Sequence, residues 1–188
     1  MATANMEEFS LPPLLQEIRQ KQEEFYEKTK KHIFFKKAQK EECAKFISSH
    51  YSLEILIQST LVVDKESNQI IFYYPVFKLY INKDNYKQLI SYMITTFSEC
   101  SRTNKFTLIL DADSITPTAL ERYSYFIGEY REQYEEFKKS FYPGEDYSSN
   151  IEKIRIINVN SFFENFKSVI RPFCEADVYS KIEFVGKA

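Results

Sequence analysis

The sequence predicts an α/β domain: a mostly parallel, mixed sheet of five strands flanked by helices, with a helical cap at the N-terminus. Three observations predict it. Five segments are rich in β-branched or apolar residues, the segments between them place apolar residues at helical spacing, and the two kinds alternate along the chain. Such alternation is typical of parallel strands joined by crossover helices. With 188 residues, of which 44% are hydrophobic, the chain suits one domain with a full core.

The N-terminal part, residues 1–51, predicts two helices. The first begins near Ser10, whose hydroxyl can cap backbone N–H groups, and runs to about Lys31. The second covers residues 36–49. Because this part is polar and strongly charged, we expect it to form a cap that leans on a main domain of residues 52–188.

A hairpin is expected at the start of the main domain. Residues 55–63 are rich in β-branched side chains and predict a strand, residues 64–68 predict a turn, and residues 70–74 predict the second strand. Asp84 can then cap a helix that runs to about Ser101.

The middle of the chain predicts a buried strand and a long helix. Residues 106–110 are continuously apolar, as in a strand covered on both faces. Thr116 followed by Pro117 is a helix start signal, and we expect one helix that continues to Phe141 and ends at residues 143–144.

The last part predicts two strands with a helix between them. A buried strand lies within residues 151–159, and the final strand covers residues 182–185. Ser161 and Glu164 form a capping box that opens an aromatic-rich helix, which stops before Pro172.

Composition argues against several classes of function. The net charge of -2 provides no overall field that would attract nucleic acid, and the three glycines lie too far apart for a phosphate-binding loop. The three cysteines lack metal-ligand spacing, no apolar stretch approaches the length of a membrane span, and residues 1–10 lack the apolar core of a signal peptide. We therefore expect a cytoplasmic protein without cofactor or metal, whose contact with a membrane is at most peripheral.

Residues 158–174 resemble the most recognisable stretch of CRAL-TRIO lipid-binding domains. In that family an apolar strand is followed by a turn, an aromatic-rich helix and an Ile-Lys-Pro-Phe sequence, which reads Ile-Arg-Pro-Phe at residues 170–173 here. The family then opens its last strand on a Lys-Ile pair, here residues 181–182. Upstream, residues 142–143 (Tyr-Pro) and 110–111 (Leu-Asp) match family features in the same order.

The chain departs from the family pattern at a few places. Asn160 replaces the proline of the turn, Ser114 replaces a glycine after the central strand, and residues 144–149 are extra. The family usually continues beyond the Lys-Ile strand, whereas this chain stops soon after it.

The resemblance implies a non-catalytic domain that binds a phospholipid or another lipid for lipid sensing, lipid transfer or membrane targeting. The lipid would lie between the sheet and a movable helix at residues 161–173, because apolar chains gain free energy on leaving water. The phenylalanines of that helix could equally pack on the sheet. The implied pocket residues are Phe106, Leu108, Tyr123, Phe126, Tyr130, Ile154, Ile156, Phe162, Phe163, Phe166 and Ile170.

A headgroup site is also implied. In members that hold phosphoinositides, a lysine at the position of Lys181 contacts the headgroup, and a glutamate follows the Tyr-Pro pair. The candidate headgroup residues are therefore Lys181, Arg171 and Glu145, although Lys181 could also be a solvated residue at the strand edge.

Three other interpretations remain open. Some relatives of the family bind small GTPases or their regulators, so the domain could be a protein-interaction scaffold. Asp111 and Asp113 follow an apolar strand and could hold Mg²⁺ or Mn²⁺ in a transferase, or form a helix-capping turn, which we expect. A basic patch could dock on anionic headgroups or be a solvated face; it consists of Lys28, Lys30, Lys31, Lys36, Lys37 and Lys40.

Overall fold

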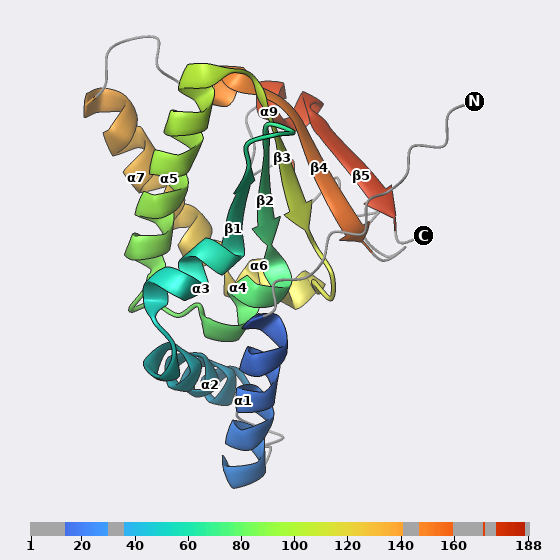
Figure 1. Ribbon diagram of the computed structural model, residues 1–188. Helices are drawn as coiled ribbons and strands as arrows, with labels where there is room; N and C mark the ends of the chain where they lie inside the picture. The colour runs from blue at the N-terminus through green and yellow to red at the C-terminus, as the bar shows by residue number, and fades with distance from the viewer. Residues whose placement is uncertain (1–13, 30–35, 141–146, 160–170, 172–175, 187–188) are drawn as a thin grey trace.

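The computed structural model describes residues 14–29, 36–140, 147–159, 171 and 176–186 (Figure 1). The predicted fold class is confirmed: helices flank a mixed sheet of five strands in the order β1-β2-β3-β4-β5. The strands are β1 (Leu61–Asp64), β2 (Gln69–Tyr73), β3 (Phe106–Asp111), β4 (Ile151–Val159) and β5 (Ile182–Gly186). The described helices are α1 (Leu14–Thr29), α2 (Lys36–His50), α3 (Leu53–Thr60), α4 (Tyr74–Tyr80), α5 (Tyr86–Thr103), α6 (Pro117–Arg122), α7 (Ser124–Ser140) and α9 (Ala176–Ser180), with a 3-10 turn η1 (Tyr147–Asn150).

The sheet topology follows the alternation in the sequence. The β1–β2 hairpin is antiparallel, and β2, β3, β4 and β5 run parallel to one another. Figure 1 shows α5 and α7 side by side at one side of the sheet, and α1 and α2 beyond the ends at which the parallel strands finish. This arrangement places α4, which follows β2, between the sheet and the N-terminal helices.

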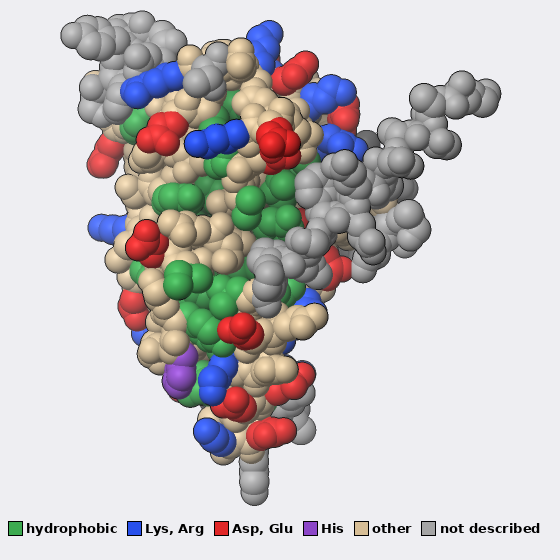
Figure 2. All heavy atoms as spheres, viewed as in Figure 1, with side chains coloured by type: hydrophobic (Ala, Val, Ile, Leu, Met, Phe, Trp, Pro, Cys, Tyr) green, Lys and Arg blue, Asp and Glu red, His purple; other side chains and the backbone are tan. Residues whose placement is uncertain are grey.

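The N-terminal helices share one core with the sheet. Leu15 and Ile18 of α1, and Cys43 and Ile47 of α2, belong to the same cluster of buried residues as the strands. On the face seen in Figure 2, hydrophobic side chains lie in the middle, around β1, while charged side chains lie toward its ends, including over α1 and α2. The helical cap therefore packs on the main domain through apolar side chains.

The expected strand over residues 55–63 is wrong for its first part, which is α3. Leu56, Ile57 and Thr60 are buried at helical spacing, while Ile55 is 51% exposed. The i, i+1, i+4 pattern of burial suits a helix that packs on α4, and these tertiary contacts outweigh the β-propensity of isoleucine. The strand begins only at Leu61.

The expected long helix is interrupted. Tyr123 separates α6 from α7 and has φ -97° and ψ 11°. Its ring is buried edge-on against Phe77 of α4, with a centroid distance of 4.8 Å. A continuous helix is replaced by two because this anchoring contact turns the chain, and the end expected at residues 143–144 lies outside the described residues.

Two further differences concern helix starts. Asp84 does not cap α5, which begins at Tyr86; instead the Asp84 carboxylate lies 2.9 Å from the Lys45 ammonium. Helix α4 was not expected at all, because it is short and buried on all sides and so shows no apolar periodicity. Helix α9 was also not expected, and the helix expected over residues 161–173 lies outside the described residues apart from Arg171.

Candidate functional site

One face of the sheet carries two rows of apolar side chains. Residues paired across neighbouring strands point to the same face, because side chains alternate along each strand. Two such rows cross all five strands: Leu61, Phe72, Leu110, Ile156 and Phe184, and beside them Val63, Ile70, Leu108, Ile154 and Ile182. We call these ten residues the apolar face.

The opposite face of the sheet is apolar at β2 and β3 and polar at β4 and β5. The row that lies between the two apolar rows consists of Val62, Ile71, Ile109, Arg155 and Glu183, of which Ile71 and Ile109 are buried. Lys153 also lies there, and its Nζ is 3.1 Å from Glu183 Oε1, with both side chains about half exposed. The sheet therefore turns one face toward water at β4 and β5.

Helices cover part of the apolar face. Phe72 contacts Phe77 of α4 with a centroid distance of 5.3 Å, and Phe77 contacts Phe126 of α7. Phe106, two residues before Leu108 on β3, stacks on Phe97 of α5 at 6.1 Å. The helices α4, α5 and α7 thus pack on the side of the sheet toward which the apolar rows point.

The cover is incomplete. Leu61, Ile70, Ile154 and Ile156 are buried, but six members of the apolar face are only partly buried: Val63, Phe72, Leu108, Leu110, Ile182 and Phe184. Four of these six lie on β3 and β5. The apolar face therefore offers hydrophobic surface on the part of the sheet that follows the hairpin.

The predicted pocket residues divide into three groups. Leu108, Ile154 and Ile156 lie together on the apolar face, with Phe106 at the start of the same central strand. The second group packs within the helical layer: Tyr123 and Phe126 contact Phe77, and the Tyr130 hydroxyl shares a hydrogen bond with that of Tyr147. The remaining residues lie outside the described residues: Phe162, Phe163, Phe166 and Ile170.

The predicted headgroup residue Lys181 lies just before β5 and makes two polar contacts. Its Nζ is 3.0 Å from the Asp177 carboxylate and donates a hydrogen bond of 3.1 Å to the Ser148 carbonyl. Lys181 thereby ties α9 to η1. Arg171 is exposed, and Glu145 lies outside the described residues.

The two aspartates at the end of β3 form a turn: Asp111 is its last residue, and Asp113 follows it. The buried Asp111 accepts hydrogen bonds at Oδ1 from the Asp113 backbone N–H (3.0 Å) and from Asn158 Nδ2 (2.9 Å). Within the described part of the chain, no group of three or more metal-ligating side chains comes together. These contacts favour the turn over a metal site.

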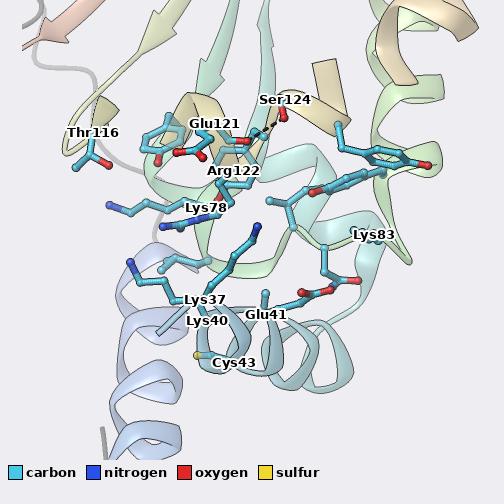
Figure 3. A pocket seen from close by; sticks show the side chains of 18 of the residues that line it. Lys37, Lys40, Glu41, Cys43, Lys78, Lys83, Thr116, Glu121, Arg122 and Ser124 are labelled. Carbon is cyan, nitrogen blue, oxygen red and sulfur yellow. Dashed lines mark hydrogen bonds between the residues drawn. The ribbon is translucent and has the colours of Figure 1, made fainter. Parts of the chain in front are cut away.

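The basic patch on α2 leads to a groove that the sequence did not predict. A cavity of about 470 Å³ lies between α1 and α2 on one side and α4, the loop after β3 and α6 on the other (Figure 3). Lys37 and Lys40 reach up from α2, and Lys78 and Arg122 lie opposite them. Sequence reasoning missed the groove because four segments far apart in the chain build it.

The groove brings several positively charged side chains together and partly removes them from water. The Lys40 side chain is exposed, but the walls of the groove partly desolvate its ammonium and so lower its pKa, and the nearby charges of Arg122 and Lys36 lower it further. Burial likewise lowers the pKa of Lys78, which the carboxylates of Asp113 and Asp111 only partly counter. Acidic residues also line the groove, namely Glu41 and Glu121.

Because the groove contains the buried Tyr86, we expect the protein to lose stability at alkaline pH. Burial raises the pKa of Tyr86 to about 12 from its usual value near 10, so between these values the unfolded chain has lost a proton that the folded chain keeps. Stability present below about pH 10 is therefore lost as the pH rises toward about 12. Urea unfolding at about pH 8 and at about pH 11 measures how much the free energy of unfolding falls between these two values. This fall should be smaller for Tyr86→Phe than for the wild type, and an equal fall would contradict the prediction.

Comparison of the chain with protein-family models gives no match, and a search of curated proteins gives none.

Among the described residues, no helix is both long enough and apolar enough to cross a membrane.

Proposed function

We propose that this chain is a lipid-binding domain of the CRAL-TRIO type, in which the acyl chains of a phospholipid or another lipid lie on the apolar face. The observation that carries the proposal is the partly uncovered apolar surface of Leu108, Leu110, Ile182 and Phe184. Each Å² of apolar surface removed from water contributes about 25 cal/mol, so an acyl chain that covers this surface gains substantial free energy.

Backbone geometry after the central strand supports the proposal. Ser114 has a φ of 58°, in the left-handed region that favours glycine. This is the position at which the sequence resemblance places a glycine in CRAL-TRIO domains. Asn158, the next-to-last residue of β4, has a φ of 60° and donates a hydrogen bond from Nδ2 to Asp111 Oδ1, so the carboxyl ends of β3 and β4 are held together.

Transfer of a fluorescent phosphatidylcholine from vesicles tests the proposal. Leu108→Trp should reduce lipid uptake at least tenfold, because the larger ring occupies the apolar face of the central strand. The matched control is Thr107→Trp, since Thr107 is its neighbour on β3, points to the opposite face and is also partly buried. We expect the control to bind within about twofold of the wild type.

Native mass spectrometry of the purified protein provides a second readout. A lipid mass that is present in the wild type and lost in Leu108→Trp would support the proposal. A wild-type protein that carries no lipid and takes none up from vesicles would overturn it.

A further inference from the structure

We propose that the groove between α2, α4 and α6 binds a phosphate monoester, with Lys40, Lys78 and Arg122 as its principal donors. The inference goes beyond the lipid proposal, since it concerns a different part of the molecule and does not require the apolar face. It rests on the shape of the groove, on the cations that converge there and on how they are held.

The charge of the groove lining selects an anion. Five basic side chains line it, namely Lys37, Lys40, Lys78, Lys83 and Arg122, against two acidic ones, Glu41 and Glu121. The excess of three positive charges exceeds what a single carboxylate ligand would neutralise. A phosphate monoester carries between one and two negative charges at neutral pH and offers three acceptor oxygens, which suits several converging donors.

The cations come from different elements and meet at one opening. Figure 3 shows Lys37 and Lys40 rising from α2 toward Lys78 of α4 and Arg122 of α6. Among the described residues, neither Lys40 nor Arg122 forms a salt bridge with a carboxylate. Bringing like charges together in a partly desolvated groove is unfavourable, and a bound anion would relieve this repulsion.

Two of the donors are held in place before any ligand arrives. Arg122 lies over the ring of Tyr123 at 5.8 Å, and Lys78 lies over the ring of Tyr74 at 5.7 Å. Lys78 also donates a hydrogen bond to the Ser114 hydroxyl, at the left-handed position after β3. Because aromatic and hydroxyl contacts position the side chains, less conformational entropy is lost on binding.

The position and size of the groove also suit a small ligand. It lies at the carboxyl ends of β2 and β3, the edge at which open α/β sheets bind ligands. Its volume of about 470 Å³ falls within the usual range for small-molecule sites. A phosphorylated polyol, either free or as a lipid headgroup, has the matching chemistry.

Calorimetric titration of the full chain with inositol 1,4,5-trisphosphate tests the proposal for a free ligand. Co-sedimentation with phosphatidylcholine vesicles that contain phosphatidylinositol 4,5-bisphosphate tests it for a headgroup. Arg122→Gln and Lys78→Gln should each raise the dissociation constant at least about tenfold, because each removes a charge-assisted hydrogen bond. Lys40→Gln should have a similar effect, and since Lys40 is exposed this variant should fold normally.

The matched control is Lys139→Gln, which removes the same charge from an exposed position near the far end of α7. Fifteen residues of helix separate it from Ser124 at the groove, about 22 Å at 1.5 Å per residue. We expect the control to bind within about twofold of the wild type. Binding to vesicles that contain phosphatidylinositol 4,5-bisphosphate, but not to phosphatidylcholine vesicles without it or to the soluble compound, would identify a lipid headgroup. Binding of the soluble compound without binding to these vesicles would identify a free ligand, and binding of both would support the phosphate site that the two probes share.

Two results would overturn the proposal: a wild type that binds neither probe, or groove variants that bind as tightly as the Lys139→Gln control. Neither result bears on the lipid proposal, because its test uses phosphatidylcholine, which carries no phosphate monoester.

Discussion

Ile47→Ala should lower the free energy of unfolding by about 2–4 kcal/mol and leave a single unfolding transition. Ile47 lies on α2 and is fully buried, in the same core cluster as Ile70 of β2 and Ile109 of the central strand β3. Replacing it removes apolar contacts and leaves a cavity between α2 and the main domain. Urea unfolding followed by circular dichroism measures both the free energy and the number of transitions.

The matched control for this prediction is Ile55→Ala. It makes the same substitution on α3, where Ile55 is 51% exposed. We expect a change within about 0.5 kcal/mol, because the side chain is already in contact with water and alanine is the better helix former. Two separate transitions for Ile47→Ala, with the second at the wild-type midpoint, would show that the N-terminal helices unfold independently of the sheet.

Asn85→Ala should lower the free energy of unfolding by about 2–3 kcal/mol, because it opens a buried polar network. Asn85 Nδ2 donates to the Tyr80 carbonyl and to the Ser48 hydroxyl, both at 3.2 Å. Asn85 Oδ1 accepts from the Asn82 backbone N–H at 2.9 Å. The network joins α2 to the segment between α4 and α5, so the loss of one member leaves buried groups on both sides with fewer partners.

Urea unfolding again gives the measurement, with Asn104→Ala as the control. Asn104 is the exposed residue that follows α5, and its replacement should change stability by no more than about 0.5 kcal/mol. Equal effects for the two variants would show that the Asn85 contacts contribute no more than surface contacts do.

The two proposed sites differ in how far the sequence predicts them. The apolar face was partly predicted: Leu108, Ile154 and Ile156 were named as pocket residues, and Leu108 pairs with Ile154, next to which Ile156 lies on the same face of β4. Because side chains alternate between the two faces along a strand, the residues of one face can be predicted once the strands are located. Phe184 on β5 and Phe72 on β2 also belong to this face, which only the register of the sheet shows.

The basic groove was beyond sequence reasoning. Lys37 and Lys40 were noticed as part of a charged segment, but nothing in the sequence connects them with Lys78 or Arg122. The connection exists because α2 packs on α4, and because the break at Tyr123 brings Arg122 to the same opening. Electrostatic sites of this kind depend on distances between segments rather than on residue spacing.

The sequence by itself determined the elements whose residues carry a clear local signal. Strands β3 and β4, the hairpin turn at Asp64–Asn68 and helix α2 follow from runs of apolar or β-branched residues, from turn residues and from helical spacing, although β4 is exposed on one face where the sequence predicts a buried strand. Tertiary structure alone decided that residues 53–60 form a helix and that a single expected helix breaks at Tyr123. The physical reason is that burial against distant side chains, such as Tyr123 against Phe77, contributes more free energy than the local backbone preferences it overrides.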